Sequence, residues 1–380
     1  MASPILYYMI YYMAQTAFGT FAPIYYKSIA GTDTQVGIIL GMAPLITIAS
    51  QFVWGQAADR ARYKNNVLTF LLVVTAACAC LLPVFPVYGY TLLMVGLLSF
   101  FFNATTQMSD AIVLENAGKF GWRFNVIRLA ACLSFAVMSV FVGLLAGIEL
   151  WLTFYLFACI IFLAAVAFRF LPKVEGQAAS GEKLSYRQLF ANRKIVQLYV
   201  FCLVIFLGMT YYFSFFSIYY VEVIGGSREM LGVYMLVGAL SEVPFLLFAG
   251  RLVRAGNAHK WMLASAGFMA VRWLLCGLIR SPSLVLLIFI MHGGTVIIFR
   301  YCMAVYINES IAPGLKATAQ ATAGLVFDGV AAALASFSGG VLNDLFGSAP
   351  MFLFYSAFTA VAVIVFAFFF RRQGFIRSGG

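Results

Sequence analysis

The chain has 380 residues, of which 63% are hydrophobic and only 10% are charged, and its mean hydropathy is +0.97. A soluble globular domain is about 45 to 50% apolar and about 25% charged, so this composition excludes one and indicates an integral membrane protein. The formal net charge of +11 does not indicate a nucleic-acid partner, because no basic stretch has the pattern of an RNA- or DNA-binding module. The expected partners are the lipid bilayer and a small-molecule substrate.

Apolar runs bounded by charges, glycine or proline predict an all-α fold of twelve spanning helices, because about 20 residues cross a bilayer. The predicted helices cover residues 5–26, 35–57, 66–85, 88–114, 124–147, 150–171, 195–221, 230–253, 260–280, 283–307, 317–341 and 349–371. The longest polar interval, 172–194, is expected to be a cytoplasmic linker. It separates an N-terminal six-helix bundle, 1–171, from a C-terminal six-helix bundle, 195–380.

An internal repeat supports this division into two pseudo-symmetric halves. Matched residues recur 194 or 195 positions apart: Ile24–Tyr26 with Ile218–Tyr220, Gly31 with Gly225, Gly37 with Gly232, and Gly55 with Gly250. Two similar rigid bodies can close alternately on either side of a central site, as an alternating-access transporter requires.

A short polar loop between the second and third predicted helices indicates how the chain is oriented in the membrane. Its marked residues are Gly55, Asp59, Arg60, Arg62 and Lys64. The cations are expected to hold the loop in the cytoplasm. Gly55 is expected to allow a close helix approach, and Asp59 to face a helix N-terminus. Both chain termini are then cytoplasmic, and the short loops suggest a bacterial inner membrane.

The spacing Gly-x-x-x-Asp-Arg-x-x-x-Lys in this loop resembles the motif that joins helices 2 and 3 of the major facilitator superfamily of secondary transporters. Asp110-Ala111, followed eighteen residues after Asp110 by Arg128-Leu129-Ala130-Ala131, resembles the proton-linked lactose permease and phenylpropionate permease branch. The resemblance implies two six-helix bundles and proton symport. It also implies that the loop motif locks a cytoplasmic gate.

Ionisable residues inside spanning helices are costly and usually line a cavity or pair with one another. This chain has seven: Asp110, Arg128, Glu242, Arg272, His292, Arg300 and Asp328. The resemblance implies that Asp110 and Arg128 contact substrate or each other. Phe135 stands where lactose permease has a sugar-stacking tryptophan, which argues against galactoside recognition. The alternative for the first pair is a salt bridge that only joins two helices.

By the same resemblance, Glu242, Arg272 and His292 couple substrate binding to proton movement. A buried carboxylate near an arginine can exchange protons as water access changes, and histidine titrates near neutral pH. Lactose permease carries its proton on a carboxylate three residues after this histidine, where this chain has Thr295. The proton then rides on Glu242, or failing that on Asp328 or His292, or there is no coupling. For His292, a packing role is the alternative.

Arg300 and Asp328 are predicted to pair across the tenth and eleventh helices, either as a coupling element or as a mutually neutralised structural pair. Tyr7 with Tyr11, and Tyr8 with Tyr12, stack at i to i+4 on the first helix. Tyr11 and Asn103 are therefore further candidates for substrate contact. Interface anchoring and lipid contact are the alternative role for the aromatic residues.

The sequence predicts a secondary transporter that takes up a small polar organic solute, such as a sugar, nucleoside or aromatic acid, with a proton. No cofactor or metal is expected, apart from the proton as coupling ion, and the carrier is expected to act as a monomer. A drug/proton antiporter is the nearest alternative, although the predicted helix 124–147 lacks the proline of such exporters. An uncoupled facilitator remains open. A membrane receptor or enzyme is disfavoured, because no nucleophile, base and orienting group converge.

Overall fold

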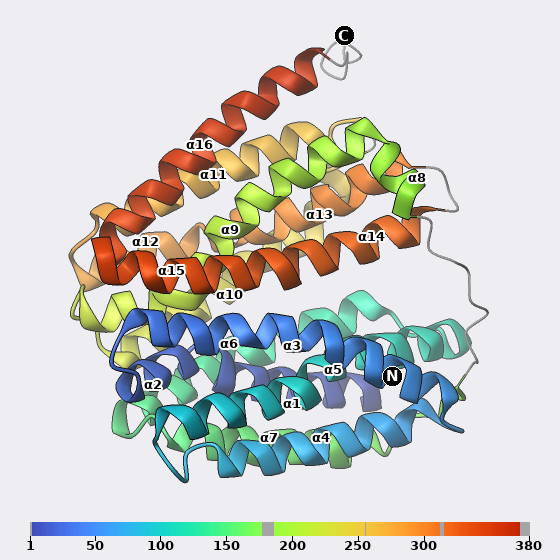
Figure 1. The fold of residues 1–380 in the computed structure, drawn as a ribbon. Helices are drawn as coiled ribbons and strands as arrows, with labels where there is room; N and C mark the ends of the chain where they lie inside the picture. Colours follow the sequence, from blue (N-terminus) through green and yellow to red (C-terminus); the bar gives the residue numbers. More distant parts are fainter. Residues whose placement is uncertain (1, 177–185, 255, 312–314, 373–380) are drawn as a thin grey trace. The chain divides into compact units, whose positions relative to one another are not determined.

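The structure is a computed structural model that describes residues 2–176, 186–254, 256–311 and 315–372. It divides into two compact units, each described by itself. Unit 1 comprises Met1–Gly181 and Gly226–Leu236, and unit 2 comprises Glu182–Gly225 and Val237–Gly380. The described part of each unit is almost entirely helical (Figure 1).

The described residues of unit 1 form seven helices besides the first residues of α10. They are α1 (Ala2–Gly19), α2 (Ala22–Ile29), α3 (Asp33–Arg60), α4 (Lys64–Leu81), α5 (Tyr88–Phe120), α6 (Phe124–Ile148) and α7 (Leu152–Phe168). Helix α1 packs against α6 and α7, while α5 and α7 both contact α4. Small buried residues on α1, Ala14 and Ala17, allow the close approach that membrane helices use.

The first predicted helix, 5–26, is not continuous. It is interrupted after Gly19, and α2 begins at Ala22 with a proline, Pro23, in its first turn. Proline lacks a backbone N–H and clashes with the preceding turn, so it starts a new helix more readily than it continues one. The expectation of one uninterrupted helix is therefore wrong at this point.

Unit 2 contains the remaining helices (Figure 1). They are α8 (Tyr186–Ala191), α9 (Arg193–Glu222), α10 (Arg228–Leu252) from Val237 onward, α11 (Ala258–Leu278), the 3₁₀ turn η1 (Pro282–Leu284), α12 (Val285–Ile290), α13 (His292–Ser310), α14 (Lys316–Gly324), the π-helical segment η3 (Leu325–Ala331), α15 (Ala332–Phe346) and α16 (Ser348–Arg372). Helix α11 contacts α13 and α16, and α9 contacts η3, α15 and α16.

Ten helices of the described chain are long and apolar enough to cross a membrane, and Leu152–Phe168 is a shorter apolar helix. The predicted tenth and eleventh helices correspond to η1–α13 and to α14–α15. Each departs from regular α-helical geometry: the tenth where α12 gives way to α13 at Met291, and the eleventh at η3. Such irregularities cluster at functional positions in helices.

The polar loop between the second and third predicted helices is shorter than expected. Helix α3 continues to Arg60, so Gly55 and Asp59 lie in its last turns. A Cβ atom at Gly55 would meet no atom within 4 Å, so the expectation of a close approach there is wrong. The close approach lies at Gly176, where a Cβ would come within 2.3 Å of the Ala61 carbonyl oxygen.

The segment 172–176 crosses this loop as a strap that is held by hydrogen bonds. The Lys64 amide donates to the Val174 carbonyl at 2.9 Å, and the Val174 amide donates to Asn65 Oδ1 at 2.8 Å. Asn65 Nδ2 also donates to the Pro172 carbonyl at 3.2 Å. Residues 177–185 of the expected linker and 373–380 of the C-terminal half lie outside the described residues.

Candidate functional site

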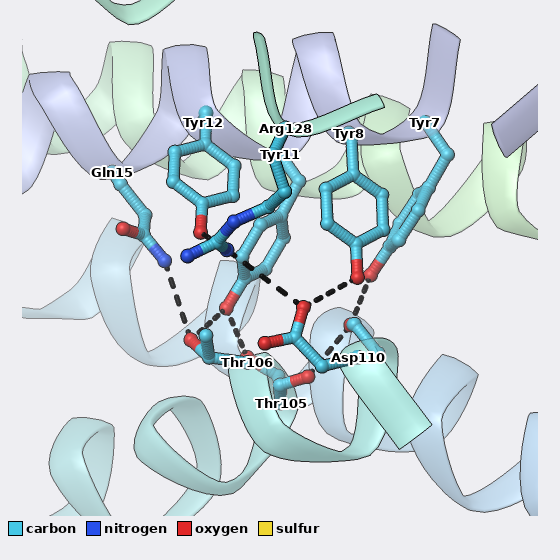
Figure 2. A network of polar contacts seen from close by, with 10 residues as sticks. Tyr7, Tyr8, Tyr11, Tyr12, Gln15, Thr105, Thr106, Asp110 and Arg128 are labelled. Carbon is cyan, nitrogen blue, oxygen red and sulfur yellow. Dashed lines mark hydrogen bonds and ion pairs between the residues drawn. The ribbon is translucent and has the colours of Figure 1, made fainter. Parts of the chain in front are cut away.

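A polar cluster in unit 1 joins α1, α5 and α6 around Asp110 (Figure 2). Tyr8 and Tyr12 are one turn apart on α1, so both rings lie on the same face of that helix, with their centroids 6.1 Å apart. Tyr8 donates from its hydroxyl to Asp110 Oδ1 at 2.5 Å. The helix period thus brings a tyrosine hydroxyl to a carboxylate that lies 102 residues away along the chain.

Arg128 on α6 faces the same carboxylate. Its Nη1 atom lies 3.8 Å from Asp110 Oδ1 and also donates to the Tyr12 hydroxyl. The guanidinium carbon is 5.3 Å from the centroid of the Tyr12 ring. The Arg128 and Asp110 side chains are 42% and 31% exposed, so both retain polar atoms that a ligand can reach. The expected pairing of these two residues is confirmed.

A row of further hydrogen bonds between α1 and α5, most of them buried, lies beside this ion pair (Figure 2). Tyr7 and Ser109 share a hydrogen bond of 2.6 Å, and the Tyr11 hydroxyl lies 2.7 Å from the hydroxyls of both Thr105 and Thr106. Gln15 Nε2 donates to Thr106 at 3.2 Å. Buried polar groups need such partners, and a fully connected row fixes the register of α1 against α5.

The other residues of unit 1 that were predicted to contact substrate do not contact the Asp110–Arg128 pair. Tyr11 is only 1% exposed, so its ring lies in the interface between α1 and α5 rather than at the ion pair. Asn103 lies two turns before Asp110 on α5 and donates to Thr47 at 2.5 Å. Phe135 lies two turns after Arg128 on α6, half-buried, and its carbonyl accepts from Thr16 at 3.4 Å.

Tyr8 and Tyr12, rather than Tyr11, are the tyrosines that contact the ion pair. The i to i+4 spacing of the α1 tyrosines was visible in the sequence. It did not show which of the two tyrosine faces turns toward α5 and α6, because helix rotation follows from packing.

In unit 2, Glu242 on α10 contacts His292, the first residue of α13. His292 Nε2 lies 3.1 Å from Glu242 Oε1, and both side chains are largely buried. The contact depends on a close helix approach, because a Cβ at Gly293 would come within 2.1 Å of the Ser241 carbonyl oxygen. The Gly293 amide also donates to Ser241 Oγ at 2.9 Å. Glu242 and His292, two of the three residues that the resemblance grouped as coupling residues, are therefore brought together.

Arg272 on α11 is fully buried, and its partner is neutral. Its Nη1 atom donates to Thr295 Oγ1 at 3.1 Å, while Nε and Nη2 have no hydrogen-bond acceptor. The guanidinium carbon lies 4.3 Å from the centroid of the Tyr212 ring. Within the described chain no carboxylate oxygen lies within 4.0 Å of Arg272. Arg272 thus contacts α13, the helix that begins at His292, but it is not paired with Glu242.

Arg300 on α13 and Asp328 on η3 form a second ion pair in unit 2. Arg300 Nη2 lies 2.6 Å from Asp328 Oδ1, and Nη1 donates to Oδ2 at 3.3 Å. The side chains are 42% and 54% exposed. The guanidinium carbon lies 4.9 Å from the centroid of the Phe206 ring on α9. The prediction that these two residues pair is confirmed.

The basic loop residues lie at the end of α3 and the start of α4. Lys64 is 3.7 Å from Glu115 on α5, and the Arg62 guanidinium lies 5.4 Å from the centroid of the Tyr63 ring. Asp59 and Arg60 occupy the last helical turn of α3. The strap 172–176, which the sequence analysis did not single out, is the element that holds this loop.

Comparisons with known proteins show the family and the fold. The profile of the MFS_1 like family matches residues 5–354. The maltose permease of Geobacillus stearothermophilus is 27% identical over 97% of this chain and 94% of that protein. The probable 3-phenylpropionic acid transporter of Escherichia coli (strain K12) is 22% identical over 76% of this chain and 77% of its own.

The crystal structure of the nucleoside transporter NupG has a TM-score of 0.82 at 15% identity, covering 97% of this chain and 98% of that one. The expected helical membrane fold of major facilitator transporters is therefore confirmed. The matched family and relatives are multi-pass membrane transporters and not enzymes.

Proposed function

The chain belongs to the MFS_1 like family of membrane transporters, and on that premise we propose that it takes up a small polar organic solute together with a proton. The observation that carries the proposal is the half-exposed Asp110–Arg128 pair with its two tyrosines. Its carboxylate accepts hydrogen bonds, its guanidinium donates them, and tyrosine rings pack on the apolar face of a sugar or a base.

A sugar is the solute to test first. The most extensive sequence match reported above is to a maltose permease, and that name applies to the relative. The nucleoside and phenylpropionate transporters among the similar proteins make uridine and 3-phenylpropionate the natural comparison compounds. Direct solute contacts come from Asp110, Arg128 and Tyr12, whereas Tyr8, which is buried, holds the Asp110 carboxylate. Phe135 and Asn103 lie two turns away along the same helices.

The Glu242–His292 pair supports proton coupling. A carboxylate and an imidazole 3.1 Å apart can share one proton, and Arg272 contacts the same turn of α13 through its hydrogen bond to Thr295. Alternating access would expose the pair to one side of the membrane and then to the other. Thr295 occupies the position three residues after His292, where the resemblance to lactose permease implies a carboxylate, so Glu242 is the proposed proton carrier.

We further place the carrier in a bacterial inner membrane as a monomer, with both termini in the cytoplasm. The basic residues of the α3–α4 loop support this orientation, because positively charged loops stay on the cytoplasmic side. Asp59 and Arg60 at the end of α3 are the proposed cytoplasmic gate.

Proteoliposomes that enclose a pH-sensitive dye test the function. Addition of maltose outside should acidify the lumen in the wild type. The variant E242Q should still bind maltose without acidification, and D110N should lose binding at least about tenfold. Glu149→Gln, at the exposed end of α6, is the matched control and should behave as wild type.

The other outcomes separate the alternatives. Solute entry without a proton signal would identify an uncoupled facilitator, which Thr295 beside Arg272 specifically favours. Expulsion of a lipophilic cation, with no uptake of maltose, uridine or 3-phenylpropionate, would contradict the proposal in favour of drug/proton antiport.

A further inference from the structure

A polar cavity lies in unit 1, between the start of α4, the end of α7 and the strap 172–176. Its volume is about 380 Å³, within the roughly 300 to 1,000 Å³ of pockets that bind small molecules. The residues that line it include Asn65, Asn66, Thr69, Phe168, Arg169 and Lys173. Helices α4 and α7 lie side by side in unit 1 (Figure 1). The cavity is separate from the cluster around Asp110, none of whose residues lines it.

Two cations and no carboxylate line this cavity. Arg169 directly follows α7, and Lys173 lies on the strap. Both residues are exposed, and within the described chain no carboxylate oxygen lies within 4.0 Å of either side chain. The Lys173 ammonium lies 5.1 Å from the centroid of the Tyr63 ring, a contact that leaves its charge unneutralised. Glu175 is on the same strap, but it does not line the cavity.

The neutral polar groups on α4 differ in what they can offer a ligand. The side chain of Asn65 is engaged, because both its amide nitrogen and its oxygen hold the strap. The Thr69 hydroxyl donates to the Asn65 carbonyl at 2.9 Å. Asn66 is exposed, and its side chain makes no hydrogen bond within the described chain. The groups open to a ligand are thus the Arg169 guanidinium, the Lys173 ammonium and the Asn66 amide, all of which donate hydrogen bonds, so the cavity favours an anion.

Exposed apolar side chains flank the cavity. Phe170, which follows Arg169, is 75% exposed. Phe70 on α4 is 51% exposed. Farther along the same two helices the exposed residues include Val73, Phe162 and Val166. In a chain that spans a membrane such a surface faces hydrocarbon, so the cavity lies where the lipid-facing surface of α4 and α7 meets the polar strap.

We propose that this cavity binds the phosphate of an anionic phospholipid, whose acyl chains lie along the exposed apolar surface of α4 and α7. The inference goes beyond the proposed function and does not depend on the transported solute. A guanidinium binds two phosphate oxygens through parallel hydrogen bonds, and an ammonium adds a point charge. Basic pockets at the ends of membrane helices recognise anionic headgroups through this chemistry.

The charges around the cavity favour a headgroup with a net negative charge. Phosphatidylglycerol brings a single negative charge, whereas phosphatidylcholine adds a quaternary ammonium to its phosphate. No carboxylate lines the cavity to accept that ammonium. The Arg62 guanidinium lies 5.4 Å from the centroid of the Tyr63 ring, the same ring that Lys173 contacts, and adds to the repulsion.

The alternative is that Arg169 and Lys173 only keep this end of the chain in the cytoplasm. That role requires neither a cavity nor an apolar surface beside it. The two readings differ in what they predict for lipid binding, because a purely topological cation attracts any anionic surface without a defined site.

The test uses the purified full chain in detergent, with radiolabelled phosphatidylglycerol and phosphatidylcholine as probes and inorganic phosphate as the free anion. The variant is R169Q/K173Q. The charge-matched control is R123Q/R193Q, which removes two exposed arginines outside the cavity, one just before α6 and one at the start of α9. The Kd of each lipid is measured for the three proteins. The rate of trypsin cleavage after Lys173 is measured for the wild type with each lipid and with millimolar phosphate.

We expect the Kd for phosphatidylglycerol to be about tenfold higher or more in R169Q/K173Q than in the wild type, and unchanged in R123Q/R193Q. Phosphatidylcholine should bind all three proteins equally weakly. Phosphatidylglycerol should slow cleavage after Lys173 in the wild type several-fold, because a ligand that binds the closed strap reduces its opening. This second readout needs no variant.

Three results would overturn the inference. An equal loss of phosphatidylglycerol affinity in the two double variants would indicate attraction to the basic surface as a whole. Equal wild-type affinity for the two lipids would remove the preference for an anion. Protection of Lys173 by inorganic phosphate but not by phosphatidylglycerol would assign the cavity to a free phosphate. None of these measurements involves a transported solute, so their failure is distinct from failure of the proposed function.

Discussion

Arg272 donates a hydrogen bond of 3.1 Å to Thr295, so the polar partner of a fully buried cation is a neutral hydroxyl. Arginine stays charged at any working pH, and a buried charge without a counter-charge is unfavourable by several kcal/mol. The Thr295 hydroxyl donates to the His292 carbonyl at 2.7 Å while it accepts from Arg272, so both of its hydrogen bonds are within the protein. This pairing leads to two predictions.

The first prediction is that Thr295→Asp stabilises the carrier. Aspartate is close to threonine in size and would give Arg272 an anionic acceptor, so the free energy of unfolding should rise by roughly 1 to 3 kcal/mol. The measurement is the thermal unfolding midpoint in detergent, with Thr295→Asn as the neutral control of the same shape. Equal midpoints for the two variants would show that Arg272 does not lack a counter-charge.

The second prediction concerns removal of the charge. Arg272→Met keeps much of the side-chain volume and abolishes the unpaired cation, so the variant should be more stable than wild type by about 1 kcal/mol or more. It should nevertheless lose pH-driven solute accumulation, because the positive charge beside Thr295, three residues after His292, would be absent. Thermal unfolding and proteoliposome transport are measured on the same preparation. A less stable variant with normal accumulation would contradict both parts.

The third prediction separates the two rows of tyrosines on α1. Tyr8→Phe removes the 2.5 Å hydrogen bond to Asp110 at the exposed pair, so solute affinity should fall by about tenfold. Tyr7→Phe removes the buried bond to Ser109 and should cost about 1 kcal/mol of stability with little change in affinity. Equilibrium binding and thermal unfolding of both variants check the contrast. Equal affinity losses would place both hydroxyls in the same role.

The fourth prediction tests the approach of α10 and α13 that brings Glu242 to His292. Gly293→Ala would drive a Cβ within 2.1 Å of the Ser241 carbonyl oxygen, and the helices must separate. We expect destabilisation by about 2 kcal/mol or more and loss of proton coupling. Gly267→Ala on α11, where a Cβ meets nothing within 4 Å, is the control and should be neutral or slightly stabilising. A tolerated Gly293→Ala would refute the close contact.

The fifth prediction concerns the strap 172–176. Asn65→Ala removes the hydrogen bonds that Asn65 makes to Pro172 and Val174, so the strap should detach from α4. Trypsin should then cleave after Lys173 several times faster than in wild type, because local opening sets the rate of proteolysis. Asn66→Ala, at the neighbouring exposed position, should leave the rate unchanged. Equal rates for the two variants would show that Asn65 does not hold the strap.

The sequence by itself determined that the protein lies in a membrane, approximately where its helices run and which charged residues fall within them. Those conclusions depend on composition, on the length of apolar runs and on the cost of a charge in hydrocarbon, all of which are properties of the linear chain. The internal repeat could also be found from the sequence, because it requires only that one half of the chain be matched with the other.

Only the tertiary structure decided how the charged residues are partnered. In the structure Arg272 contacts Thr295, and Glu242 contacts His292. Tyr8 and Tyr12, rather than Tyr11, contact the Asp110–Arg128 pair. The physical reason is that contacts across helices depend on the rotation and register of each helix, which packing sets. A one-residue change of register turns a helix by about 100°, enough to exchange one tyrosine face for another.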